Sequence, residues 1–254
     1  MTSFSRIAVA AAALSVAAIS PVSSHAQALP AASDIVAKYI TAIGGKDEIM
    51  KVTSLKQMGV MEIPAVGLTA TMELFTAAPN KQALKATIPG MGEMVSGYNG
   101  TVGWDVNPMQ GPRLKADKEL VTAAEDADFY ANLLYTAEKY SSMETVGDTT
   151  INGEKAFKVK MVRKTSKTES QSFFSATSGL LLGSVSTAES AMGSTQLSQS
   201  ILEYKKFGGV MFPTKVEQSA GAQKIIMTIK DVTINGAPES AFEVPAQVKP
   251  LIKP

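Results

Sequence analysis

Residues 68–90 read LTATMELFTAAPNKQALKATIPG, and their pattern decides the fold class. Apolar and polar side chains alternate from Leu68 to Leu74, which is the period of a strand with one buried face. Two turn signals follow, Pro79-Asn80 and Pro89-Gly90. The stretch therefore predicts half-buried antiparallel strands joined by tight turns.

The same pattern continues on both sides of this stretch. Asn99-Gly100 marks a turn between two strands, Asn152-Gly153 is a two-residue hairpin signal, and Val102, Trp104 and Val106 alternate on one strand face. Short apolar runs between turns predict about 11 sequential antiparallel strands. So many strands favour a strongly curved sheet, an open β-barrel or half-barrel, in a mainly β fold that also contains α-helix.

Two segments have helical spacing instead. Residues 33–43 place apolar side chains on one stripe, with Ser33 as a candidate N-cap. Residues 117–140, with Asp117 as a candidate cap, interrupt the two sets of strands. We expect one helix in the first segment and one or two in the second, lying on the sheet.

The N-terminus reads as a secretory signal peptide. Arg6 precedes an Ala-rich apolar run over residues 7–19, and small residues stand at Ala26 and Ala28. We predict cleavage after Ala28, which leaves residues 29–254 as a single domain. No later stretch reaches the about 20 apolar residues of a membrane-spanning helix. The expectation is an exported, soluble, periplasmic protein that is not integral to a membrane.

The residue types present limit the chemistry. The chain has no cysteine, and its one histidine, His25, lies in the predicted signal peptide. The remaining residues cannot form a Ser-His-Asp triad, a cysteine nucleophile or a zinc site with imidazole or thiolate ligands. An enzyme would need Asp, Glu, Lys or Tyr alone, and no such constellation stands out. We expect a binding protein with no catalytic residues, no metal and no cofactor.

The charge balance argues against nucleic acid as a partner. Without Arg6, 23 basic residues face 23 acidic ones, whereas binding to nucleic acid depends on neutralising phosphates. Six basic residues do cluster in one predicted hairpin: Lys155, Lys158, Lys160, Arg163, Lys164 and Lys167. They are typical of an exposed hairpin that resists edge pairing. The alternative is a patch for an anionic membrane surface, a lipid headgroup or an acidic partner.

Methionine is unusually frequent and aromatic residues are sparse. The chain has 13 Met but only 9 Phe, 6 Tyr and 1 Trp. Flexible thioether side chains suit surfaces that accept varied apolar ligands, although they also fill ordinary cores. A large curved sheet with so few bulky side chains has room for a cavity.

Four segments resemble the lipoprotein-carrier family typified by LolA and LolB. Residues 71–81 (TMELFTAAPNK) are followed by 98–108 (YNGTVGWDVNP), in the family's order of a Pro-Asn turn and then a tryptophan-containing hairpin. Residues 204–214 (YKKFGGVMFPT) are similar to a strand-turn-strand unit of periplasmic relatives. Residues 241–248 (AFEVPAQV) are similar to the family's ending.

This resemblance implies an open β-barrel with a helical lid over an apolar cavity that carries acyl chains. LolA-type carriers have a basic residue before the proline of the Pro-Asn turn, where this chain has Ala78. Lys81 lies on the other side of that turn. The difference favours a lipidic ligand in general over lipoprotein transfer in particular.

The leading hypothesis is a soluble periplasmic carrier or binding protein for a lipid, a lipoprotein acyl chain or another amphiphile. The alternative is a sensory or scaffold domain that recognises a protein partner of the cell envelope with the same curved sheet. The candidate cavity and lid residues are Met61, Met72, Leu74, Trp104, Phe129, Leu133, Val159, Met161 and Met227.

Overall fold

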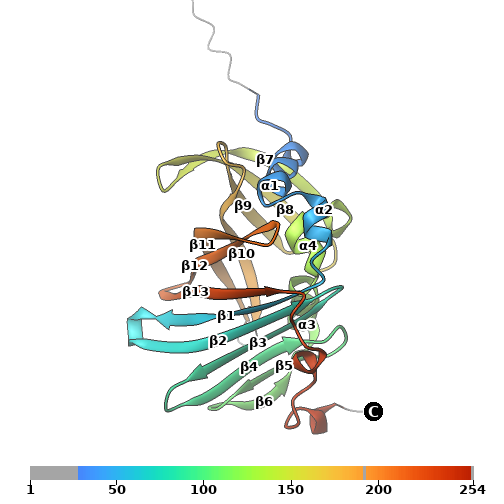
Figure 1. Cartoon of the computed structure of the whole chain (residues 1–254), viewed down its shortest axis with the longest axis vertical. Helices are drawn as coiled ribbons and strands as arrows, with labels where there is room; N and C mark the ends of the chain where they lie inside the picture. Colours follow the sequence, from blue (N-terminus) through green and yellow to red (C-terminus); the bar gives the residue numbers. More distant parts are fainter. Residues whose placement is uncertain (1–27, 191–192, 253–254) are drawn as a thin grey trace, which may run out of the picture.

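Thirteen strands form one antiparallel sheet in the computed structural model, which describes residues 28–190 and 193–252 (Figure 1). The first half of the sheet comprises β1 Ser54–Ile63, β2 Leu68–Ala77, β3 Lys81–Ile88, β4 Gly92–Tyr98, β5 Gly103–Asn107 and β6 Gly111–Leu114. The second comprises β7 Tyr140–Ile151, β8 Glu154–Arg163, β9 Glu169–Ser175, β10 Leu181–Ser190, β11 Gly193–Phe207, β12 Val210–Ala220 and β13 Gln223–Ile234. Apart from Ala28, the predicted signal peptide lies outside the described residues.

Each half is a meander, and one long-range pairing joins them. The strand order is β6-β5-β4-β3-β2-β1-β13-β12-β11-β10-β9-β8-β7, so the first strand lies beside the last. Met61 of β1 faces Met227 of β13 at this junction. The order ends at β6 and β7, which leaves the sheet open and confirms the predicted open barrel.

The strand count exceeds the expected number because some strands are too short to show a period. β6 has four residues and contains Pro112, so no alternation marks it in the sequence. The clearest hairpin signal is confirmed. Asn152 and Gly153 join β7 to β8 with φ angles of 50° and 82°, as a two-residue turn of the predicted kind requires.

Four α-helices accompany the sheet: α1 Ala32–Ala42, α2 Lys46–Met50, α3 Asp117–Asp126 and α4 Phe129–Leu134. α1, α3 and α4 occupy the two predicted helical segments, whereas α2 was not predicted. The predicted caps are wrong, because Ala31 and Ala116 hold the N-cap positions of α1 and α3 and make no side-chain cap bond. Asp128 caps α4 instead and accepts a hydrogen bond of 3.0 Å from the backbone N–H of Ala131. In residues 28–190 and 193–252, no helix has the length and apolar character needed to cross a membrane.

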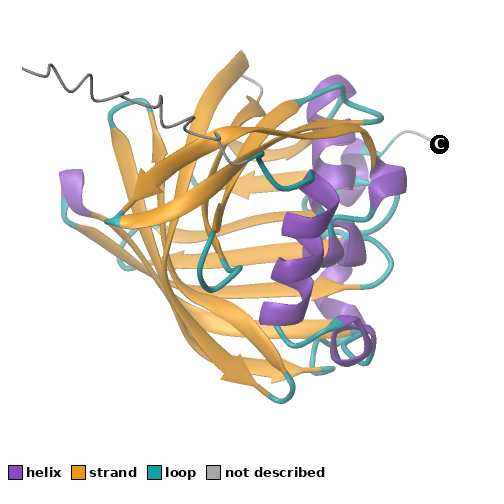
Figure 2. Ribbon diagram, turned by 90° about the horizontal axis from the view of Figure 1, so that it is seen from above, coloured by secondary structure: helices purple, strands orange, loops and turns teal. Residues whose placement is uncertain are grey.

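The helices gather at one end of the strands, and the β1–β2 hairpin with its 3-10 turn η1 (Pro64–Val66) lies at the other (Figure 2). Because the strands are antiparallel, the turns at 64–67, 89–91, 108–110 and 221–222 all fall at this second end. We call it the hairpin end.

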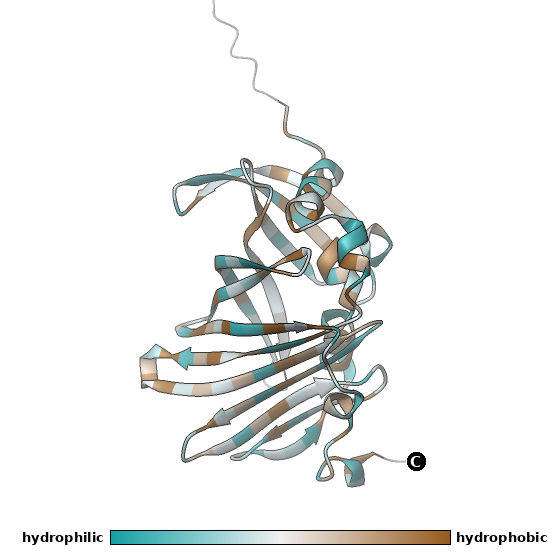
Figure 3. Ribbon diagram, viewed as in Figure 1, coloured by the Kyte–Doolittle hydropathy of each residue, from teal (hydrophilic) through white to brown (hydrophobic). Residues whose placement is uncertain are grey.

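The two faces of the sheet are covered by different parts of the chain. Hydropathy alternates along the strands of the first half (Figure 3). The inner face carries Met72 and packs against the helices in the main apolar core. The outer face of the first half is covered by the C-terminal segment, which includes η3 (Glu239–Phe242) and η4 (Lys249–Leu251).

Candidate functional site

An apolar groove with a volume of about 430 Å³ lies on the inner face of the first half of the sheet. It reaches toward the hairpin end, beyond the part of the face that the helices fill. Its apolar residues come from β1 to β5 and β13: Met61, Ile63, Leu68, Ala70, Leu84, Ala86, Ile88, Met94, Val95, Val106 and Ile225.

The strand register explains why these residues share one face. Met61 faces Ala70 on β2, and Ala86 of β3 lies between Met72 and Met94 of its two neighbours. Ala70 and Ala86 are buried at the floor of the groove, where their small side chains leave space above the sheet. The groove is therefore a consequence of small residues at central positions and longer apolar residues around them.

One end of the groove is charged. Four side chains form ion pairs here, and we call them the charged network: Asp105 of β5, Arg113 of β6, Lys115 just after β6, and Glu119 of α3. Arg113 donates two hydrogen bonds to the Glu119 carboxylate, from Nη1 at 2.7 Å and from Nη2 at 2.6 Å, and it also pairs with Asp105. Lys115 Nζ lies 2.8 Å from Asp105 Oδ1.

The charged network also attaches α3 to the sheet. The hydrogen bond to Glu119 is the main factor that raises the pKa of Arg113, with partial burial opposing it and the charge of Asp105 adding to it. The guanidinium therefore stays charged. Because two acids face two bases, this end of the groove carries both signs of charge without a net excess.

Eight of the nine predicted site residues meet in the main core on the inner face. Met72, Phe129, Val159 and Met161 are buried there, and the other four, Met61, Leu74, Leu133 and Met227, are half-buried against them. Of these, only Met61 also lines the groove. The remaining seven fill the core, with Phe129 and Leu133 on α4 and the other five on strands.

Trp104 is the exception, and its predicted place in the cavity wall is wrong. It lies on the outer face, fully buried with Val106 and with Val248 of the C-terminal segment. Alternation with Val106 correctly indicated a buried face. It could not show which face, because the C-terminal segment covers the outer side of β5 as well.

The other groove residues were missed, although a signal was present. Leu68 and Ala70 continue the alternation of Met72 and Leu74, which places all four on one face. That alternation indicated an apolar face, but it did not show that the part of the face at the hairpin end stays open as a groove. Leu84, Ala86 and Ile88 alternate with Lys85 and Thr87 in the same way. Met94 and Ile225 gave no comparable signal, since their position depends on the pairing of strands.

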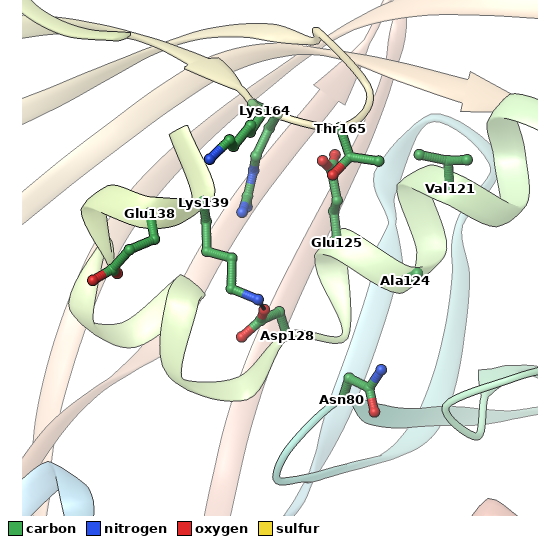
Figure 4. Close-up of a pocket in the computed structure, with 10 residues that line it drawn as sticks. Asn80, Val121, Ala124, Glu125, Asp128, Glu138, Lys139, Lys164 and Thr165 are labelled. Carbon is green, nitrogen blue, oxygen red and sulfur yellow. Dashed lines mark ion pairs between the residues drawn. The ribbon is translucent and has the colours of Figure 1, made fainter. Parts of the chain in front are cut away.

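A second, smaller pocket of about 300 Å³ lies between the helical segment and the turn after β8 (Figure 4). Lys139 extends toward Asp128, with Nζ 2.7 Å from Oδ2. The Glu125 carboxylate accepts a hydrogen bond of 3.1 Å from the backbone N–H of Ser166. Arg163 donates one of 2.6 Å to Asn132. These contacts attach α3 and α4 to the edge of the sheet, so the polar groups of this pocket are largely satisfied internally.

The basic hairpin is also partly neutralised by its neighbours. Lys155 pairs with Asp148 at 2.8 Å, and Lys160 pairs with Glu169 at 2.9 Å. Arg163 lies over the Tyr140 ring, 4.9 Å from its centroid. Such pairing is typical of a solvated strand surface. Among the described residues, no group of three or more acidic, histidine or cysteine side chains is placed to hold a metal ion.

Comparison with solved structures supports the fold described above. A DUF1329 family protein from Desulfovibrio piger superposes with a TM-score of 0.58 at 11% identity, covering 85% of this chain and 98% of that one. LolA superfamily protein NE2245 from Nitrosomonas europaea gives 0.57 at 11% identity, covering 85% and 99%. A domain from Vibrio parahaemolyticus, described as an outer membrane lipoprotein-sorting protein, gives 0.53 at 13% identity, covering 83% and 95%.

Sequence comparison gives a family but no characterised relative. No curated protein matches the chain. The model of DUF4412, a domain of unknown function, matches residues 116–248, which run from the start of α3 to the C-terminal segment. The chain thus belongs to the DUF4412 family and has the LolA-like fold of an open antiparallel sheet with helices on its inner face.

Proposed function

We propose that this protein binds the acyl chain of a lipid, a lipoprotein or a similar amphiphile in the apolar groove, and that it carries this ligand within the periplasm. The observation that carries the proposal is the groove itself. It has an apolar floor and walls, and its volume of about 430 Å³ falls in the usual range of small-molecule sites, about 300–1,000 Å³.

The driving force would be removal of methylene groups from water. Each buried methylene contributes about 0.8 kcal/mol, so about ten of them supply roughly 8 kcal/mol before the cost of association. That is enough for a reversible complex, which suits a carrier that must also release its ligand. An acyl chain would lie along the Ala70 and Ala86 floor, between Met61 and Met94.

The charged network would receive the polar end of the ligand. Arg113 and Lys115 offer hydrogen-bond donors, and Asp105 offers acceptors, at one end of the site. The other polar residues that line it, Ser96, Asn107, Gln110 and Gln223, carry no charge. An amphiphile would thus be oriented with its chain toward the hairpin end. The LolA-like fold and the signal-like N-terminus support a place in the cell envelope, and one structural relative is described as a lipoprotein-sorting protein.

A pair of neighbouring substitutions on β3 tests the proposal. Ala86→Phe fills the groove floor, whereas Thr87→Phe places the same side chain on the exposed opposite face of the same strand. Binding of a fluorescent fatty acid analogue is measured by titration. We expect Ala86→Phe to weaken binding about tenfold or more, because its ring occupies space that the chain needs, and Thr87→Phe to bind normally.

The natural ligand can be sought in parallel. Native mass spectrometry and lipid extraction of protein purified from its own periplasm should reveal a lipid-sized adduct in the unsubstituted protein and less of it in Ala86→Phe. A folded, unsubstituted protein that binds no amphiphile and yields no lipid contradicts the proposal. A stable complex with an envelope protein under those conditions supports the sensory or scaffold alternative.

A further inference from the structure

Three neighbouring hairpin tips at the mouth of the groove carry exposed apolar side chains. Val66 lies between β1 and β2, Met91 between β3 and β4, and Met109 between β5 and β6. Their exposed fractions are 71%, 44% and 76%, although each belongs to a residue type that is usually buried. All three lie at the hairpin end, and each follows a groove residue closely in the chain: Ile63 precedes Val66, Ile88 precedes Met91 and Asn107 precedes Met109.

The same tips contain no charge. Residues 63–69, 88–92 and 106–112 include no Asp, Glu, Lys or Arg, although 19% of the chain's residues are charged. Exposed turns normally collect polar and charged residues, and edge regions use charge to prevent unwanted contacts. Exposed apolar side chains without neighbouring charges indicate a surface that is buried against a partner or a membrane when the protein acts.

The tips are held in fixed turns. Gly67 ends η1 in the left-handed conformation at φ 61°, with its N–H bonded to the Pro64 carbonyl at 3.2 Å. The N–H of Met91 donates to the Ile88 carbonyl at 3.1 Å, and that of Met109 donates to Asn107 Oδ1 at 2.8 Å. The apolar side chains are therefore presented without the entropic cost of ordering a flexible loop.

We propose that these three tips dock the protein on a lipid surface, with Val66, Met91 and Met109 inserted at the level of the headgroups. The proposal rests on the proposed function for its purpose, because docking would open the groove directly to the bilayer. An acyl chain could then pass between membrane and groove without crossing water, which would otherwise oppose its transfer more strongly with each exposed methylene group.

The composition of the tips favours lipid over a protein partner. The three tips contain no charged residue, so they offer none of the ion pairs and bidentate arginine contacts that fix the register of a protein partner. Flexible apolar side chains on separate points suit a fluid surface that has no fixed shape to match. Without charge at the tips, docking should depend little on ionic strength or on anionic lipid.

Cosedimentation with vesicles tests the proposal. The unsubstituted protein should bind neutral phosphatidylcholine vesicles, and added phosphatidylglycerol or salt should change binding little. The double variant Val66→Glu/Met109→Glu should partition at least roughly tenfold more weakly, because it places two charges where apolar groups would insert. Leu202→Glu is the matched control, since Leu202 is 46% exposed on β11, away from the tips.

Binding of the fatty acid analogue to the same variants separates the two proposals. If the double variant loses vesicle binding but still binds the analogue, the result supports docking. Vesicle binding without analogue binding in the unsubstituted protein supports docking and contradicts the groove as the ligand site. An unsubstituted protein that sediments with neither vesicle type overturns docking, as does a double variant that sediments like Leu202→Glu. One further outcome overturns docking on lipid: the unsubstituted protein self-associates but does not bind vesicles, and the double variant no longer self-associates. That result would assign the tips to contact with a second copy of the chain.

Discussion

The indole of Trp104 lies directly against Gly97, its partner across β4 and β5. A Cβ atom added to Gly97 would overlap the indole ring. On the other side of the ring is the C-terminal segment, with Val248 fully buried. The tryptophan is thus enclosed between a strand that lacks a side chain and a segment more than a hundred residues away in sequence.

Gly97→Ala should therefore destabilise the protein. The added methyl group must displace either the indole or the strand, and overpacking of this kind typically costs about 1–3 kcal/mol. Urea unfolding followed by circular dichroism measures the change. In the double variant Gly97→Ala/Trp104→Leu the smaller side chain leaves room for the methyl group. The double variant should therefore lose less stability than the two single variants lose together. Strict additivity would show that the two residues are not in contact.

The fluorescence of Trp104 provides a second prediction. Its indole has no exposed surface, so emission of the folded protein should lie at shorter wavelength than that of an exposed tryptophan. Because Trp104 and the groove occupy opposite faces of the sheet, saturating amphiphile should change this emission little. The fatty acid analogue reports binding in the same sample. A large saturable quenching that Ala86→Phe removes would place the ligand beside Trp104.

The charged network should hold the N-terminal part of α3 on the sheet. Arg113→Lys keeps the positive charge but loses the double hydrogen bond to Glu119, so amide hydrogen exchange in α3 should accelerate. Since the arginine side chain is about one-third exposed, the loss of global stability should be small, about 1 kcal/mol or less. Lys51→Met, which removes an exposed ion pair with Glu48, serves as the control. Equal exchange in all three proteins contradicts this role.

Two tyrosines of the inner core, the buried Tyr39 and the half-buried Tyr204, predict a loss of stability at high pH. Burial raises the pKa of Tyr39 and of Tyr204 above the ordinary value of about 10. Above that pH the unfolded chain releases these protons while the native state retains them, so the unfolded state binds fewer protons. Stability is therefore complete below about pH 10 and falls as pH rises, by up to about 1.4 kcal/mol per pH unit for each tyrosine.

Tyr39→Phe isolates this effect. The aromatic ring keeps its edge contacts with Tyr135 and Phe174, 5.5 Å away between centroids in both cases, while the titrating hydroxyl is removed. Urea midpoints measured from pH 8 to pH 11 should decline less steeply in the variant than in the unsubstituted protein. Parallel declines would mean that Tyr39 titrates equally in the folded and unfolded chains.

Much of the fold could be read locally. The alternation in residues 68–90, the turn at Asn152-Gly153 and the helical stripe in residues 33–43 each depend on neighbours in sequence, and each is present in the structure. Backbone geometry explains this success, because strand and helix periods and turn conformations are set by a few consecutive residues. The mainly β, open-sheet fold followed from these signals.

The site depended on contacts that no local pattern contains. Pairing of Met61 with Met227 joins the two halves of the sheet, and burial of Trp104 depends on Val248. The sequence by itself determined which residues are buried, since alternation reveals an apolar face. Only the tertiary structure decided which face is covered by helices, which by the C-terminal segment and which remains open as a groove, because covering a face requires segments far apart along the chain to meet.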